Sequence, residues 1–95
     1  MIRNTVRYTG HVQGVGFRYT TTNIAARFAV AGYVQNMPDG SVRVVVEGDA
    51  VEVDAFLAAV RDQLARHIKT VDSTPSEATG EFGDPHHDDT FTVRY

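Results

Sequence analysis

The chain has 95 residues and a mass of 10.4 kDa, which suffices for one domain with its own core and excludes two, so we expect residues 1–95 to form a single domain. Hydrophobic residues make up 42% and charged residues 22%, which excludes a disordered chain, and the absence of cysteine excludes disulfides, thiolate metal sites and thiol nucleophiles. The formal net charge of −3 gives no support to nucleic-acid or anionic-membrane binding, and no apolar run approaches the ~20 residues that span a bilayer.

The first third of the chain predicts a strand, a glycine-rich loop and a helix. Apolar and polar residues alternate from Thr5 to Val12, which is typical of a half-buried strand. After the glycines that follow, apolar residues recur at spacings of three and four from Phe17 to Phe28, which predicts a helix. Gly32 is expected to end this helix as a C-cap.

The middle of the chain predicts a β-hairpin followed by a second helix. Residues 33–36 and 41–47 are rich in residues that favour strands, and a Pro-Asp-Gly turn joins them. Asp49 is placed to cap the next helix, with Glu52 three residues on as the partner in a capping box. The apolar stripe of that helix comprises Val53, Phe56, Leu57, Val60, Leu64 and Ile68.

The last part of the chain predicts a long connection and a closing strand. Residues 72–89 are rich in Ser, Thr, Gly, Pro and acidic residues, and only their early part resembles a weak strand. Apolar and polar residues alternate again from Phe91 to Tyr95, which predicts a strand. The complete order predicts an α+β fold, the ferredoxin-like split βαβ sandwich (βαββαβ), with an antiparallel sheet and two helices on one of its faces.

A candidate anion site lies between the first strand and the first helix. Gly14 and Gly16 allow successive backbone N–H groups to turn inward, and the following helix directs the positive end of its dipole to the same place. Arg18 falls in the first helical turn, from which its guanidinium can reach over the loop. Spacing alone favours a phosphate site and a plain turn equally, because the sequence matches neither the Walker A motif nor the dinucleotide fingerprint.

Three segments at fixed spacing closely resemble the acylphosphatase family. They are GHVQGVGFR at 10–18, GYVQN at 32–36 and DGSV at 39–42. The spacing of Arg18 and Asn36 and the closing FTVRY extend the resemblance over nearly the whole chain.

The resemblance implies a metal-independent hydrolase without a cofactor, which cleaves the carboxyl-phosphate bond of small acyl phosphates to a carboxylate and inorganic phosphate. It implies that Arg18 and Asn36 are catalytic, with Asn36 orienting the attacking water. The phosphate would be bound by the Arg18 side chain and by the backbone amides of Gln13, Gly14, Val15, Gly16, Phe17 and Arg18. Since an acyl phosphate has an activated leaving group, the reaction needs placement and charge neutralisation rather than a metal or a covalent intermediate.

Other functions remain open at this point. A non-catalytic phosphate-binding module would keep the same loop, and a carbamoyl-phosphate hydrolase is the other alternative, because a similar domain begins larger hydrogenase-maturation proteins. Ending after this domain favours a stand-alone enzyme. RNA binding ranks last, because the aromatic and basic strand pattern of RNA-binding ferredoxin-like domains is absent.

The segment 84–89 has the residue types of a metal site but not the spacing. It contains His86 and His87 beside three aspartates, Asp84, Asp88 and Asp89, and adjacent histidines point apart in an extended chain. A plain loop is therefore favoured. We expect a cytoplasmic monomer whose partner is a small-molecule acyl phosphate, with no nucleic acid, membrane or metal.

Overall fold

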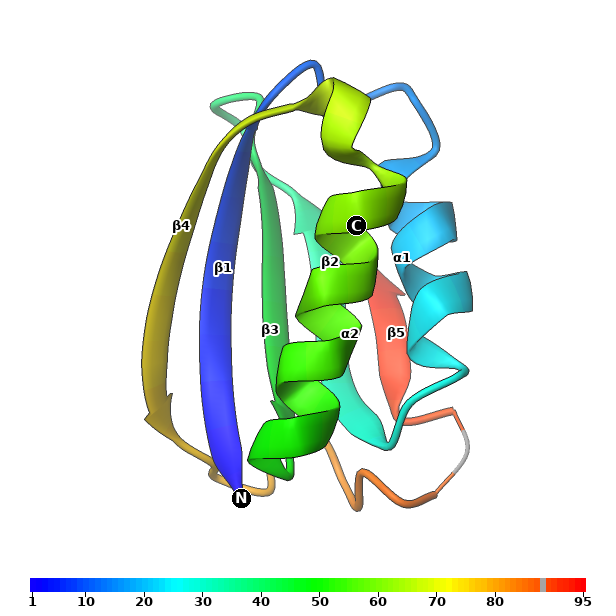
Figure 1. The fold of residues 1–95 in the computed structure, drawn as a ribbon, viewed down its shortest axis with the longest axis vertical. Coiled ribbons are helices and arrows are strands. Elements are labelled where there is room, and N and C mark those ends of the chain that lie inside the picture. Colours follow the sequence, from blue (N-terminus) through cyan, green and yellow to red (C-terminus); the bar gives the residue numbers. More distant parts are fainter. Residues whose placement is uncertain (88) are drawn as a thin grey trace.

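The computed structural model describes every residue except residue 88. Both helices cover the same face of a five-stranded sheet (Figure 1), which confirms the predicted α+β ferredoxin-like fold class. In the described part of the chain, no helix combines the length and the hydropathy that a bilayer span requires. The elements are β1 (Ile2–Gly10), α1 (Phe17–Ala25), β2 (Val30–Asn36), β3 (Val42–Gly48), α2 (Ala50–Gln63), a short 3-10 helix (Ala65–His67), β4 (Ile68–Glu77) and β5 (Phe91–Arg94).

The sheet is mixed rather than antiparallel throughout. Its strand order is β4-β1-β3-β2-β5, with three antiparallel pairs and one parallel pair, β2 with β5. The segment expected to be a weak strand is β4, a full strand of ten residues along β1. Because β1 and β2 are both antiparallel to β3, and β5 is parallel to β2, the C-terminal ends of β1, β2 and β5 meet at one end of the sheet (Figure 1).

The core lies between the sheet and the two helices, as the sequence periodicities predict. The alternation in β1 buries Val6 and Tyr8 on the helix side of the sheet. The stripe of α2 buries Phe56, whose ring centroid lies 5.3 Å from that of Phe91 in β5. Aromatic contacts of this kind join the helix layer to the edge of the sheet.

The first helix ends earlier than predicted, at Ala25, and Gly32 lies inside β2 instead of capping it. Gly32 has a φ of +147°, and a Cβ atom there would lie 1.8 Å from the carbonyl oxygen of Val45 in β3. Only glycine allows the two backbones to approach this closely. The glycine therefore serves the pairing of β2 with β3 rather than the end of α1.

The predicted capping box of α2 is also wrong. Asp49 occupies the N-cap position, but its side chain makes no capping hydrogen bond. Glu52 does not reach back to Asp49, because its carboxylate accepts a hydrogen bond of 2.8 Å from the backbone N–H of Ala29. This contact ties the first turn of α2 to the segment between α1 and β2.

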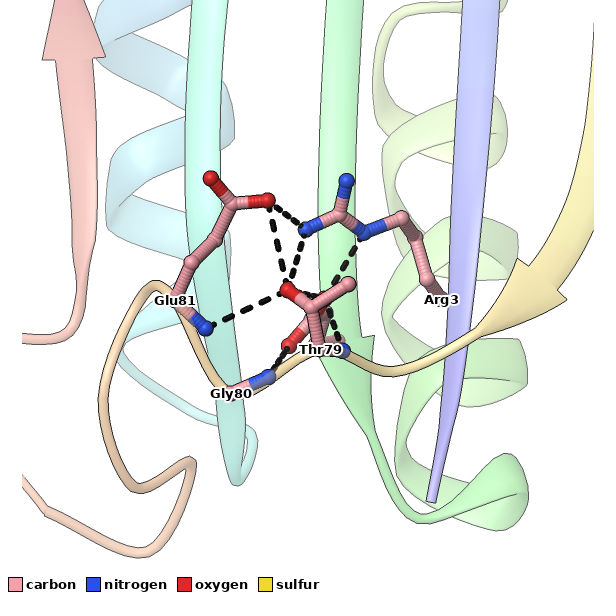
Figure 2. Close-up of polar contacts among 5 residues, drawn as sticks. Arg3, Thr79, Gly80 and Glu81 are labelled. Atoms are coloured by element: carbon pink, nitrogen blue, oxygen red, sulfur yellow. Dashed lines mark hydrogen bonds and ion pairs between the residues drawn. The ribbon is translucent and has the colours of Figure 1, made fainter.

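The connection from β4 to β5 is anchored to the sheet by the buried carboxylate of Glu47, and Figure 2 shows the polar contacts of Arg3, Thr79, Gly80 and Glu81 at this anchor. Glu47 is 2% exposed and accepts hydrogen bonds from Arg3 Nε at 2.7 Å, Thr79 N–H at 2.9 Å and Gly80 N–H at 3.0 Å. Arg3 also pairs with Glu81. Burial raises the pKa of Glu47, but the hydrogen bonds from Thr79, Arg3 and Gly80 outweigh burial and hold that pKa below its ordinary value.

Aromatic rings hold the same connection on the face of the sheet opposite the helices. Period-two alternation puts Arg3, Tyr33 and Arg94 on this face, because each lies an odd number of positions from a core residue of its own strand, namely Val6, Val34 and Phe91. The Phe82 ring lies edge-on to Tyr33 with centroids 5.7 Å apart, and the Arg3 guanidinium lies 4.9 Å from the Phe82 centroid. The connection therefore folds back over the sheet.

Candidate functional site

The loop between β1 and α1 contains two glycines in positive-φ conformations, which suit an anion-binding nest. Gly14 and Gly16 have φ angles of 76° and 79°, and Gly16 is the N-cap of α1. No side chain caps this helix end, and its first turn contains no acidic residue. The first N–H groups of a helix have no intrahelical acceptor, so those of α1 are free to meet a ligand at the positive end of the helix dipole.

A cavity of about 260 Å³ opens at this helix end. Among its described lining residues, Arg18 carries the only charged side chain, and no carboxylate of the described residues pairs with it. The cavity is therefore a local positive site in a protein of net charge −3. It is lined by Val12, Gly14, Gly16, Phe17, Arg18, Tyr19, Asn36, Val93 and Tyr95.

Asn36 reaches this cavity from the sheet. It is the last residue of β2, at the end of the sheet where β1 leads into the loop. Its Oδ1 atom is buried and has no hydrogen-bond partner among the described residues. A buried acceptor without a partner costs free energy, and a water or a ligand held at this atom would offset that cost.

The structure brings most of the predicted site residues together in this one cavity. The predicted site residues that line it are Gly14, Gly16, Phe17, Arg18 and Asn36. The Phe17 ring packs against Tyr8 in the core, with centroids 5.1 Å apart, so only the Phe17 backbone can face a ligand.

Gln13 and Val15 do not line the cavity. Val15 is half-buried and packs against the core. The Gln13 side chain turns toward the β2–β3 connection, where its Nε2 atom donates to the carbonyl oxygens of Met37 at 2.8 Å and Ser41 at 2.9 Å. Any contact of these two residues with a phosphate would have to come from their backbone amides.

Two exposed tyrosines at the cavity were missed by the sequence interpretation. Tyr19 is 73% exposed and Tyr95 is 94% exposed, and the Arg18 guanidinium lies 4.8 Å from the centroid of the Tyr95 ring. The sequence places Tyr95 at the end of the predicted closing strand. It does not show that this strand pairs in parallel with β2, and this pairing brings the strand end to the loop.

The two adjacent histidines contact different carboxylates. His86 Nε2 lies 3.6 Å from Asp49, and His87 Nε2 lies 3.8 Å from Asp84. Leaving aside Asp88, which lies outside the described residues, no group of three or more His, Cys, Asp or Glu side chains could hold a metal ion.

Comparison with known proteins identifies the family. The family model for acylphosphatase matches residues 4–92. The chain belongs to the acylphosphatase family. It is 45% identical over 84 residues to an acylphosphatase of Paenarthrobacter aurescens, covering 87% of this chain and 89% of the relative, and 43% identical to one of Methylococcus capsulatus, covering 86% and 90%. The predicted family and enzyme class, acylphosphatase, are thereby confirmed.

Solved structures place the same fold in enzymes of this family. The crystal structure of acylphosphatase from Bacillus subtilis matches with a TM-score of 0.82 at 29% identity, covering all of both chains. HypF of T. kodakarensis matches with a TM-score of 0.79 at 26% identity, with all of this chain but only 12% of HypF covered. The acylphosphatase fold thus occurs both alone and as a small part of a much larger protein.

Proposed function

We propose that the chain hydrolyses the carboxyl-phosphate bond of small acyl phosphates, releasing a carboxylate and inorganic phosphate. Membership of the acylphosphatase family supports this reaction. The observation that carries the proposal is the meeting of Arg18 and Asn36 in one cavity at the open N-terminus of α1. The positively charged Arg18 side chain, which can bind an anion, and the neutral Asn36 side chain therefore face the same small cavity.

Arg18 and the loop amides bind the phosphoryl group in this proposal. Two of the equatorial phosphate oxygens meet the guanidinium fork, and the N–H groups of residues 13–18 surround the third. Stacking on Tyr95 limits the directions in which the Arg18 side chain can point. This arrangement neutralises charge where it is largest in phosphoryl transfer.

Asn36 orients the attacking water. The new bond joins the water oxygen to phosphorus, the bond from phosphorus to the carboxylate oxygen breaks, and the water proton passes to a phosphate oxygen. An amide group suits this task, because it holds water by hydrogen bonds without changing its own charge. The unpaired Oδ1 atom of Asn36 supports the assignment.

The reaction as proposed needs no metal. Its leaving group is a carboxylate, which departs without a Lewis acid, and the positive charge comes from Arg18 and the helix end. One chain supplies every group, since the loop, α1, β2 and β5 all contribute to the same cavity. We therefore propose that a monomer is active.

The test is release of inorganic phosphate from benzoyl phosphate by the native protein in excess chelator, compared with added magnesium. Equal rates, with competitive inhibition by inorganic phosphate, are expected. Arg18→Ala should lose phosphate binding and rate together. Hydrolysis of carbamoyl phosphate but not of benzoyl phosphate would favour the carbamoyl-phosphate hydrolase. Phosphate binding without turnover of either substrate would favour the non-catalytic module.

A further inference from the structure

Gln13 links the candidate phosphate loop to the hairpin that carries Asn36. Its Nε2 atom donates two hydrogen bonds, to Met37 O and to Ser41 O, at 2.8 and 2.9 Å. Met37 directly follows Asn36 in the chain, and the Gln13 side chain is partly buried between the two segments. Among the described hydrogen bonds, these two are the ones that join the 11–16 loop to residues 37–41.

The hairpin end that Gln13 holds is itself a rigid frame. Met37 N–H donates to Ser41 O at 2.8 Å and Gly40 N–H donates to Met37 O at 3.1 Å, which closes the turn. Asp39 accepts hydrogen bonds from the Ser41 N–H and hydroxyl and pairs with Arg7 at 2.8 Å. The Ser41 and Arg7 contacts hold the pKa of Asp39 well below its ordinary value.

The loop is held at its two ends, where Val12 and Phe17 are buried in the core, and two glycines lie between them. Gly14 and Gly16 both adopt positive φ angles, and a Cβ atom at either position would meet nothing within 4 Å. Glycines in open space leave the backbone free to change conformation. Core packing of Val12, Val15 and Phe17 holds the loop on the domain, and the Gln13 amide supplies its hydrogen bonds to the hairpin that carries Asn36.

We propose that the Gln13 side chain is a positioning residue, which sets the distance between the phosphate held by the loop and Arg18 and the water held by Asn36. This inference rests on the proposed function and deepens it. The backbone N–H of Gln13 can bind phosphate as well, but the side chain acts only through Met37 and Ser41. A misplacement of about 1 Å between reacting groups can cost about 100-fold in rate.

The test compares Gln13→Ala with the control Gln63→Ala, an exposed glutamine at the end of α2. Inorganic phosphate affinity, kcat and KM for benzoyl phosphate are measured on each folded variant. We expect Gln13→Ala to lower kcat by about 10-fold or more while phosphate affinity stays near native, and Gln63→Ala to change neither. Gln13→Met, which keeps the approximate length without adding a charge but loses the donors, should resemble Gln13→Ala.

The double variant Gln13→Ala/Asn36→Ala separates positioning from a general structural role. If Gln13 acts through Asn36, the double variant is no slower than Asn36→Ala, whereas independent effects would add. Additive losses, native kcat in Gln13→Ala, or phosphate affinity that falls in step with kcat would each overturn the inference. An inactive native protein would instead overturn the proposed function, and the inference with it. A side-chain amide resonance of Asn36 that shifts in Gln13→Ala, but not in Gln63→Ala, supports the link without relying on turnover.

Discussion

The guanidinium of Arg18 lies 4.8 Å from the centroid of the Tyr95 ring, at the cavity that Asn36 also lines. An exposed cation–π contact of this kind is worth about 0.5–1 kcal/mol. Tyr95→Ala should therefore raise KM for benzoyl phosphate by about 2- to 5-fold and leave kcat nearly unchanged. Tyr95→Phe keeps the ring and should keep the native KM. An unchanged KM in Tyr95→Ala would mean that the ring does not help to hold Arg18.

Asn36 and Arg18 have different tasks in the proposed reaction, and their variants should differ accordingly. Asn36→Ala removes a contact to the water rather than to the anion, so kcat should fall by about 100-fold while inorganic phosphate binds with near-native affinity. Steady-state kinetics and phosphate inhibition measure the two effects separately. Gln35→Ala, at the neighbouring position of β2, is the control. Near-native turnover in Asn36→Ala would make Asn36 a turn residue.

Glu47 should contribute to the loss of stability in acid. Its pKa is lowered in the folded state, so its contribution to the free energy of unfolding is complete above the ordinary pKa of a glutamate and is lost as pH falls through the lowered value. Glu47→Gln should cost about 2–3 kcal/mol at pH 7 and should flatten the loss of stability below about pH 5. Urea unfolding at several pH values measures both. The exposed Glu77→Gln is the control, and an equal cost there would contradict the assignment.

Two glycines offer a matched test of the pairing between β2 and β3. Gly32→Ala would put a Cβ atom 1.8 Å from the Val45 carbonyl, and Gly40→Ala has a positive φ of 91° but open space around it. We expect Gly32→Ala to lose about 3 kcal/mol or more and Gly40→Ala about 1–2 kcal/mol. Thermal or urea unfolding ranks the two. Equal losses would show that the dihedral angle alone decides the cost.

The elements that the sequence predicted well are those with a clear period. Alternation of apolar and polar residues predicts β1 and β5, and the spacing of Val53, Phe56 and Val60 predicts α2. Each pattern arises because one side of the element is buried in the core. Gly32 was misassigned for a physical reason. A helix end and a close strand pair both favour glycine, and only the position of the Val45 carbonyl distinguishes them.

The site was predictable only in part for a similar reason. Gly14, Gly16 and Arg18 follow one another in the sequence, so their meeting at a helix end can be deduced locally. The acceptors of the Gln13 side chain are backbone carbonyls of a turn that is distant in the sequence. No pattern of residue types predicts these hydrogen bonds. Residues 78–87 show no clear period, and their place depends on the carboxylate of Glu47 and on the contacts of the Phe82 ring.

The short edge strand β5 has a consequence for how the cavity opens. It has four residues and pairs only with β2, yet Val93 and Tyr95 from this end of the chain form part of the cavity wall. Edge strands with few backbone partners exchange their amide hydrogens through local opening, well before the whole domain unfolds. Fraying of this strand would carry Tyr95 away from Arg18 while the loop, α1 and Asn36 stay in place. A short edge strand of the sheet and one wall of the cavity are thus the same piece of chain.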